Sequence, residues 1–165
     1  MNRLTLLRHA KSSWNDPGLA DFDRPLNKRG RRDAPMMGKR LAERNVQPDL
    51  VLCSPALRAR LTAEAVIGEL AGNPKWLLFD PHLYLAELSQ LVSLLRGIAR
   101  DRHDVLLIGH NPGLTDLANY LVDGHIANLP TCALFSVELT ASDWSRLDRC
   151  QARTLFYDYP KNTTP

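Results

Sequence analysis

The chain has 165 residues, a length that fits one domain with a substantial hydrophobic core. Hydrophobic residues make up 44% of it and charged residues 24%, as is usual for globular proteins. The net charge of +3 is too small to predict nucleic-acid binding. No apolar run approaches the roughly 18 residues of a transmembrane helix, and the start lacks the features of a signal peptide. We therefore expect a cytoplasmic protein with no nucleic-acid or membrane partner.

The three cysteines, Cys53, Cys132 and Cys150, are odd in number and widely spaced. No pair has the spacing of a metal-binding knuckle, and the first two lie in apolar runs, where a free thiol behaves as a small hydrophobe. We expect all three cysteines to have structural roles.

Short apolar runs alternate along the chain with longer segments of helical periodicity. The expected strands cover residues 4–7, 50–53, 76–79, 104–108, 133–139 and 153–157. The expected helices run from a cap at Asn27 to about Asn45, from Pro55 to about Leu70, from Glu87 to Arg100, and from the turn at 109–113 to about Val122.

This alternation predicts an α/β fold, a three-layer α/β/α sandwich with a mostly parallel central sheet whose late strands are antiparallel. Apolar runs without alternation, such as Val105–Ile108, suit central strands that are covered on both faces. A single domain is expected to span residues 1–159. We expect the tail, residues 160–165, to be disordered.

Polar residues that can bind or react with a phosphoryl group follow three of the expected strands. His9 follows the first strand, Ser54 the second and His110 the strand at 104–108, while Arg8 and Arg58 accompany them. Because functional groups collect beyond the carboxyl ends of parallel strands, we expect these side chains to converge. Guanidinium groups match phosphate oxygens bidentately, and helix N-termini add N–H donors. One histidine at a strand end is more often structural, but this combination predicts a phosphoryl site.

The chemistry of such a site depends on a neutral histidine. A nucleophilic imidazole needs an unprotonated nitrogen, and nearby arginines disfavour the imidazolium form of His9. A backbone carbonyl that accepts from its other nitrogen would define the tautomer. Attack on phosphorus then gives a phosphohistidine that water hydrolyses, with positive groups neutralising the equatorial oxygens. This scheme requires no metal and no other cofactor.

The motifs at these three strand ends resemble those of the histidine phosphatase superfamily, branch 1, which includes the cofactor-dependent phosphoglycerate mutases. Arg8-His9-Ala10 resembles the family's Arg-His-Gly motif, with Ala in place of Gly. The segment from Ser54 to Thr62 resembles its Ser-x-x-x-Arg-Ala-x-x-Thr segment, and Ile108-Gly-His-Asn-Pro-Gly resembles its second histidine motif. The resemblance covers residues 4–121 and implies a phosphoglycerate mutase-like fold.

Within the superfamily, the chain is most similar to the small SixA-type phosphohistidine phosphatases. The points of similarity are Leu-Leu-Arg-His-Ala-Lys-Ser-Ser-Trp14, the segment Asp23–Gly30 and the short length. The resemblance implies that His9 is the nucleophile and that a loop arginine closes over the phosphate. It assigns the phosphate pocket to Arg8, Arg24, Arg58, His110 and, from the longer mutase-like motif, Asn15. Short members of this type are usually monomers.

The leaving group separates the possible functions. Alkyl phosphate esters need a proton donor, whereas phosphohistidine leaves more easily. The candidate acid is Glu87, although a plain acidic residue in the first turn of a helix is the favoured interpretation, and Asp16, Asp21 and Asp23 are weaker candidates. The main hypothesis is a phosphatase for phosphohistidine of a protein. The alternatives are a small-molecule phosphomonoesterase and, less favoured, a non-catalytic module that binds a phosphorylated partner.

Overall fold

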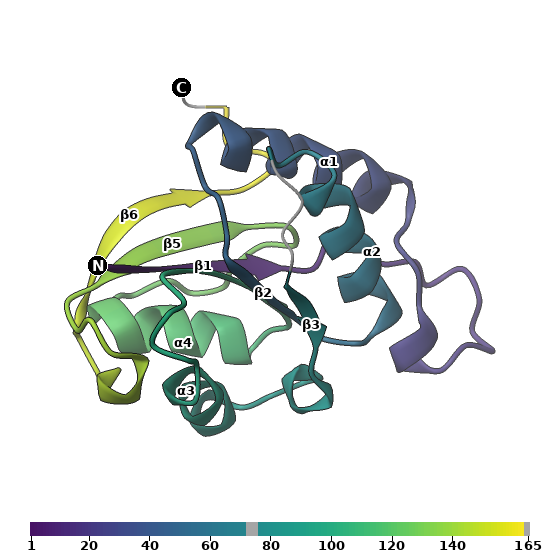
Figure 1. Cartoon of the computed structure of the whole chain (residues 1–165). Helices are drawn as coiled ribbons and strands as arrows, with labels where there is room; N and C mark the ends of the chain where they lie inside the picture. The colour runs from purple at the N-terminus through teal and green to yellow at the C-terminus, as the bar shows by residue number, and fades with distance from the viewer. Residues whose placement is uncertain (72–75, 164–165) are drawn as a thin grey trace.

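The computed structural model describes residues 1–71 and 76–163, and within them the chain forms one six-stranded sheet (Figure 1). The strands are β1 (Asn2–Arg8), β2 (Leu50–Cys53), β3 (Leu77–Phe79), β4 (Asp104–Gly109), β5 (Leu134–Leu139) and β6 (Ala152–Asp158). They lie in the order β3-β2-β4-β1-β5-β6. β5 is antiparallel to both of its neighbours, whereas β1, β2, β3 and β4 pair in parallel. The carboxyl ends of β1, β2 and β4 therefore meet at one edge of the sheet.

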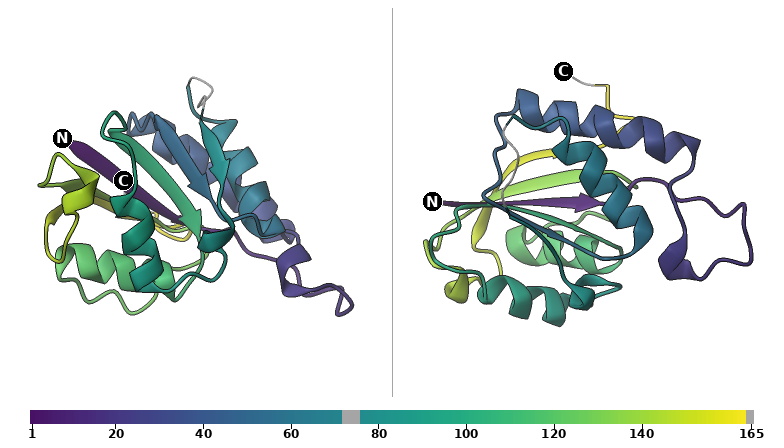
Figure 2. Two further views of the ribbon diagram at one scale, coloured as in Figure 1. Left: turned by 60° about the horizontal axis from the view of Figure 1, so that its bottom comes forward. Right: turned by 45° about the vertical axis from the view of Figure 1, so that its right-hand side comes forward.

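Helices cover both faces of this sheet. α1 (Lys28–Glu43) and α2 (Leu57–Ile67) pack against one face, and α3 (Leu88–Arg96) and α4 (Gly113–Val122) pack against the other (Figure 2). The predicted three-layer α/β/α sandwich with a mostly parallel sheet is confirmed. In the part of the chain that the structure describes, no helix is both long and apolar enough to cross a membrane.

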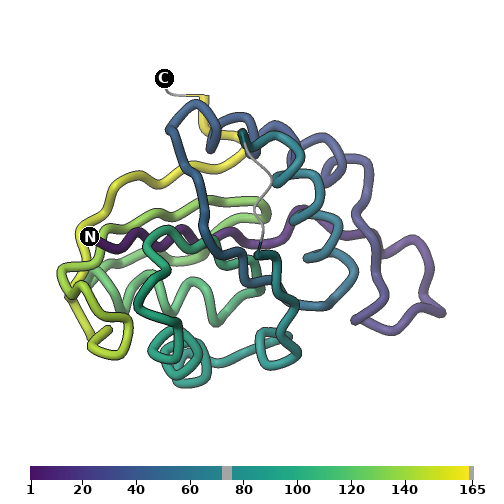
Figure 3. The backbone as a smooth tube through the Cα atoms, in the orientation of Figure 1, coloured from purple at the N-terminus to yellow at the C-terminus, as the bar shows by residue number. Residues whose placement is uncertain are grey.

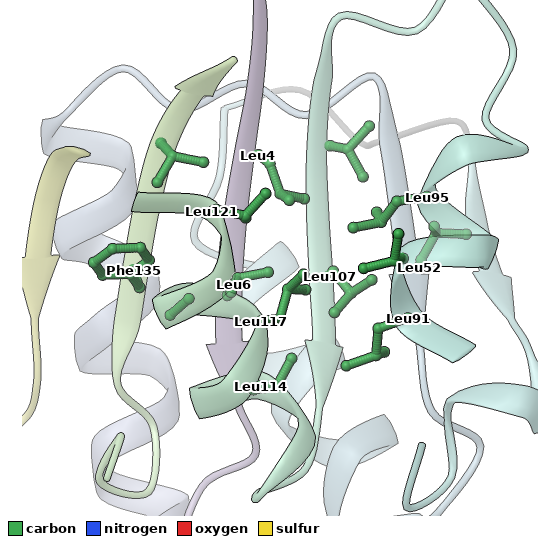
Figure 4. Packing of buried hydrophobic residues seen from close by; sticks show 14 of the residues in the cluster. Leu4, Leu6, Leu52, Leu91, Leu95, Leu107, Leu114, Leu117, Leu121 and Phe135 are labelled. Carbon is green, nitrogen blue, oxygen red and sulfur yellow. The ribbon is translucent and has the colours of Figure 1, made fainter. Parts of the chain in front are cut away.

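The hydrophobic core is divided between the two faces of the sheet. Leu6 of β1 and Leu107 of β4 belong to the cluster under α4, together with Leu114 (Figure 4). Leu7 belongs to the cluster on the opposite face, with Met37 of α1. Adjacent strand residues serve different clusters because they point to opposite sides of a sheet. Residues 105–108 are 0% exposed, which confirms that this apolar run is a central strand.

Several helix ends differ from the prediction, and α2 is shorter at both ends. α2 begins at Leu57, so the prediction that Pro55 opens this helix was wrong. The backbone N–H of Ala56 donates to Ser54 Oγ at 3.3 Å, which orders the turn before the helix. α3 ends at Arg96, earlier than the periodicity predicted, and a glycine follows it directly.

A long loop, residues 11–25, connects β1 to α1 and is called the first loop below. It contains the 3-10 helix η1 (Asp21–Asp23), and a bridge between Ser12 and Leu26 closes its base. The loop extends beyond the carboxyl end of β1, beside α2 (Figure 3). Residues 14–23 are exposed, so little of the loop contributes to the core.

The end of the chain continues past the predicted domain boundary at residue 159. Arg40 of α1 donates hydrogen bonds to the carbonyl oxygens of Tyr159 at 3.0 Å and Pro160 at 3.4 Å. Residues 164 and 165 of the tail, which we expect to be disordered, lie outside the described residues.

Candidate active site

The structure brings the predicted strand-end side chains together. Arg8 of β1 is in register with Gly109 of β4, so the residues that follow these strands are neighbours. The ring centroids of His9 and His110 are 5.1 Å apart. Arg58, in the first turn of α2, places its Nη2 3.4 Å from His110 Nδ1. The convergence predicted from a parallel sheet is therefore observed.

The imidazole of His9 is held in one tautomer by its own chain. Its Nδ1 lies 2.8 Å from the carbonyl oxygen of Ala10, which can only accept, so Nδ1 carries the proton. Nε2 then has the free lone pair, and it makes no hydrogen bond with the described residues. Burial, together with the neighbouring His110, Arg58 and Arg8, lowers the pKa of His9 to about 3, although the hydrogen bond to the Ala10 carbonyl acts in the opposite direction. The side chain is therefore neutral at physiological pH, and burial contributes more to this than the arginines do.

His110 is also neutral, but both of its nitrogens are engaged. Arg58 can only donate, so Nδ1 of His110 accepts and Nε2 donates to Ser54 Oγ at 2.7 Å. Burial, followed by the charge of Arg58, lowers the pKa of His110 to about 4. Both contacts of His110 are with residues that follow β2, namely Ser54 and Arg58. They are within reach because β2 and β4 are adjacent strands.

Two arginines carry unsatisfied donors at this site. The Nε atoms of Arg8 and Arg58 are buried without a hydrogen-bond partner among the described residues. Arg8 Nη1 donates to the carbonyl oxygen of Leu129 at 2.8 Å, which secures the side chain. Burial and the nearby charge of Arg58 lower the pKa of Arg8. Buried donors are normally paired, so this cluster is suited to an anion that accepts several hydrogen bonds.

A carboxylate from the first loop lies against the cationic cluster. Asp21 Oδ2 accepts hydrogen bonds from Arg58 Nη2 at 3.0 Å and from the hydroxyl of Tyr84 at 2.5 Å. Its Oδ1 accepts from Arg24 Nε at 3.2 Å, and Arg58 Nη1 donates to its carbonyl oxygen at 2.7 Å. The hydrogen bond from Tyr84, together with the two arginines, lowers the pKa of Asp21 to about 2. The carboxylate is therefore ionised and is not a ready proton donor in this arrangement.

Arg24 and Asn15 have different surroundings in the first loop. Arg24 is buried, donates to Ser12 Oγ at 2.8 Å and stacks over Trp14 with its Cζ 3.5 Å from the ring centroid. Its contact with Asp21 links it to the cluster. Asn15 is exposed, and its side chain makes no hydrogen bond to the described residues. The assignment of Asn15 to phosphate binding stays a prediction.

Glu87, the acid that the sequence favoured, serves as a helix cap. It lies at the N-cap position of α3, where its side chain accepts from the backbone N–H of Gln90 and the Gln90 side chain accepts from the backbone N–H of Glu87. The sequence favoured a structural role for Glu87 in the first turn of a helix, and the structure places it one position earlier, at the cap. Within the described ranges, no group of three His, Cys, Asp or Glu side chains could hold a metal ion.

Sequence reasoning missed Tyr84 and the importance of Asp21. Tyr84 lies after the 3-10 helix η2 (Pro81–Leu83), and its ring contacts both His110 and Phe22 edge-on, with centroids 5.6 and 5.1 Å apart. No motif marks this tyrosine, because its role depends on where the first loop lies. Asp21 was only one of three loop carboxylates, with no local pattern to distinguish it.

The chain is similar to known proteins in both sequence and fold. The model of the histidine phosphatase superfamily (branch 1) matches residues 4–78. An uncharacterised chloroplastic protein of Arabidopsis thaliana is 33% identical over 150 residues, which cover 86% of this chain and 68% of that protein. The Agrobacterium tumefaciens protein assigned as phosphohistidine phosphatase SixA has a TM-score of 0.83 at 28% identity, covering 96% of this chain and 98% of that one. The protein histidine phosphatase SixA in complex with tungstate has a TM-score of 0.80 at 25% identity, covering 96% and 97%.

These matches confirm the resemblance drawn from the three strand-end motifs, and they confirm the phosphoglycerate mutase-like, SixA-like fold. The chain therefore belongs to branch 1 of the histidine phosphatase superfamily, and its enzyme class is that of a phosphatase.

Proposed function

We propose that this phosphatase removes the phosphoryl group from phosphohistidine of a protein, through a phosphohistidine intermediate on His9 and without a metal ion. The observation that carries the proposal is the hydrogen bond from His9 Nδ1 to the carbonyl oxygen of Ala10. It leaves Nε2 unprotonated, and burial keeps the ring neutral. A neutral imidazole with a free lone pair beside buried guanidinium groups is suited to attack on phosphorus.

The reaction has two displacements at phosphorus. In the first, His9 Nε2 forms a bond to phosphorus as the P–N bond of the substrate breaks. The electron pair of that bond stays on the substrate imidazole, which takes a proton from water. In the second, the oxygen of a water molecule attacks phosphorus as the bond between phosphorus and His9 Nε2 breaks. The electron pair of that bond returns to Nε2, and the protons of the water leave with the inorganic phosphate or pass to bulk water. Arg8, Arg24 and Arg58 neutralise the charge on the transferring group in both steps.

The state of the carboxylates near the site favours a substrate whose leaving group needs no proton donor. An alkyl phosphate ester would need an acid beside the leaving oxygen. Glu87 is occupied in the capping box of α3, and Asp21 is an ionised partner of Arg58 and Tyr84. Phosphohistidine needs no strong acid, because its leaving imidazole is a weaker base than an alkoxide. The SixA-like relatives, named as phosphohistidine phosphatases, support the same substrate class.

The nucleophile is tested with a His9→Asn variant, which retains a polar side chain but lacks the attacking nitrogen. We expect its hydrolysis of phosphohistidine to fall by roughly 10⁴-fold or more, as when other enzymes lose their nucleophile. The matched control is His82→Asn, because the His82 side chain is exposed and its ion-pair partner is Asp80, which is not one of the predicted site residues. Acid-labile radiolabel on the wild type and on the control, but not on His9→Asn, is the expected result. Label retained on His9→Asn would refute the assignment.

The substrate class and the metal independence need separate measurements. We expect phosphohistidine to be hydrolysed at least about 100-fold faster than an alkyl phosphate ester, because Glu87 is engaged in the capping box and Asp21 is paired with Arg58 and Tyr84. Equal rates on the two substrates would favour the alternative that the protein is a small-molecule phosphomonoesterase. Binding of either compound without turnover would indicate a non-catalytic module. Activity that persists in EDTA is expected. Its loss, with recovery on adding a divalent cation, would contradict the metal-independent scheme.

A further inference from the structure

The carboxylate of Asp21 uses the hydrogen-bond donors that a phosphoryl group would need. Its Oδ2 and its carbonyl oxygen together engage both Nη atoms of Arg58, and Oδ1 engages Nε and Nη2 of Arg24 at 3.2 Å each. Carboxylate and phosphate oxygens are equivalent acceptors for a guanidinium fork. Both arginine side chains are buried, at 4% and 8% exposure, whereas that of Asp21 is 44% exposed. The aspartate therefore covers the arginines from the solvent side.

The segment that presents Asp21 lies on the surface and is anchored at its base. Residues 14–23 of the first loop are exposed, and the base of the loop is closed by the Ser12–Leu26 bridge and by a hydrogen bond from Ser13 N to the carbonyl oxygen of Pro25 at 2.8 Å. A loop that is closed at its base and makes few buried apolar contacts opens with a small free-energy change, while the rest of the fold stays intact.

The outer end of the loop is held to the body of the protein by few contacts. Asp21 bonds to Arg58 of α2 and to Tyr84, and Phe22 packs edge-on against the Tyr84 ring at 5.1 Å. Arg24 stays at the base, where it bonds Ser12 Oγ. Releasing Asp21 and Phe22 would therefore free the η1 segment, and Arg24 would lose its contacts with the Asp21 carboxylate but keep its bond to Ser12 Oγ.

We propose that Asp21 is an internal competitor for the phosphate subsite, which holds the first loop closed over Arg58 and must leave before a phosphoryl group can take the Nη donors. The inference rests on the proposed function only in taking Arg58 and Arg24 as phosphate ligands. Because only the open form binds, the apparent dissociation constant for phosphate is the intrinsic one divided by the open fraction. Removing the competing carboxylate raises that fraction and tightens binding.

The test compares Asp21→Ala with Asp23→Ala by titration calorimetry with inorganic phosphate. Asp23 is a matched control because it lies in the same η1 turn, is exposed, and its carboxylate has no hydrogen bond or ion pair with the described residues. Both variants remove one negative charge, so long-range electrostatics change alike. We expect Asp21→Ala to bind phosphate about 3- to 10-fold more tightly than the wild type, and Asp23→Ala to stay within about twofold.

The possible results separate this inference from the proposed function. Unchanged affinity in Asp21→Ala overturns the inference alone, and weaker binding overturns it in favour of Asp21 as a brace that orients Arg58. Equal tightening in both variants also overturns it, because charge alone would then account for the effect. No phosphate binding by any of the three proteins overturns the inference and the proposed function together.

A structure of the wild type with tungstate gives an independent readout. We expect tungstate on Arg58 and the Asp21 carboxylate displaced beyond hydrogen-bonding distance of Arg58 Nη2. Tungstate bound at His9 with the Asp21–Arg58 pair intact would overturn the proposal.

Discussion

Thr62 Oγ accepts a hydrogen bond from the backbone N–H of Ala10 at 2.9 Å and joins the end of β1 to α2. The same hydroxyl donates to the carbonyl oxygen of Arg58 at 2.7 Å, and Thr62 is fully buried. Ala10 in turn provides the carbonyl that accepts from His9 Nδ1. Thr62 therefore acts on the imidazole through Ala10 and is a positioning residue, which explains why a threonine lies one helical turn after Arg58.

Replacing Thr62 by Val is expected to lower both stability and turnover. The Ala10 N–H would be left buried without an acceptor, which costs about 1–3 kcal/mol of the free energy of unfolding. We expect kcat to fall more than KM rises, because the imidazole is misplaced while the arginines remain. Urea unfolding and steady-state kinetics measure the two effects. Thr62→Ser retains the hydroxyl and should restore both quantities; equal losses in Ser and Val variants would contradict the role assigned to the hydrogen bond.

Arg58→Gln is expected to reduce kcat/KM by roughly 10²–10³-fold, because a preorganised donor to the transferring phosphoryl group is lost. Arg58→Lys should not restore activity, since an ammonium cannot form the guanidinium fork. The matched control is Arg60→Gln on the same helix, where Arg60 is exposed and stacks over Phe79 with its Cζ 4.9 Å from the ring centroid. Comparable losses in the Arg58 and Arg60 variants would show that overall charge, and not the site, is responsible.

The free energy of unfolding is expected to fall as the pH is lowered from 7 to 5. The pKa values of His9 and His110 are lowered to about 3 and about 4 in the folded protein, mainly by burial. Both histidines titrate near 6.5 in the unfolded chain, so the unfolded state binds more protons across this window and stability declines with falling pH. Asp21, with its pKa lowered to about 2, affects stability only at more acid pH.

Two measurements check this pH dependence. Urea unfolding at pH 7 and pH 5 should show a smaller pH effect in His9→Asn than in the wild type. The Hε1 resonance of His9 should keep the chemical shift of a neutral imidazole from pH 8 to pH 5. A titration midpoint near 6.5 for His9 would contradict the neutral nucleophile.

Gly30→Ala is expected to destabilise the protein by about 1–3 kcal/mol, the usual cost of overpacking. A Cβ at Gly30 would lie 2.2 Å from the carbonyl oxygen of Lys11, directly after the His9-Ala10 segment. Activity should therefore fall with stability, because the backbone beside the nucleophile must shift. Gly97→Ala is the control, since the atom nearest its Cβ is 3.4 Å away. Thermal unfolding of the two variants measures the difference, and similar midpoints would refute the steric argument.

The layers of the fold could be predicted because strand and helix patterns are local. The run Val105–Ile108 is apolar at every position, and it forms a strand buried on both faces. Element ends were less predictable. Pro55 has a general preference for the first helical turn, but the Ser54 side chain orders the turn before the helix and α2 starts at Leu57. Helix limits depend on individual hydrogen bonds, and periodicity does not report these.

The sequence by itself determined that His9, Arg58 and His110 would meet, because motifs at the ends of parallel strands must converge at one edge of the sheet. Only the tertiary structure decided the hydrogen-bond partners of these side chains. His9 bonds to the Ala10 carbonyl, His110 bonds to Ser54, and Arg58 bonds to Asp21. The reason is physical. Strand ends follow from a repeating local pattern, whereas the contact of a loop carboxylate with a buried arginine depends on how the whole first loop folds back over α2.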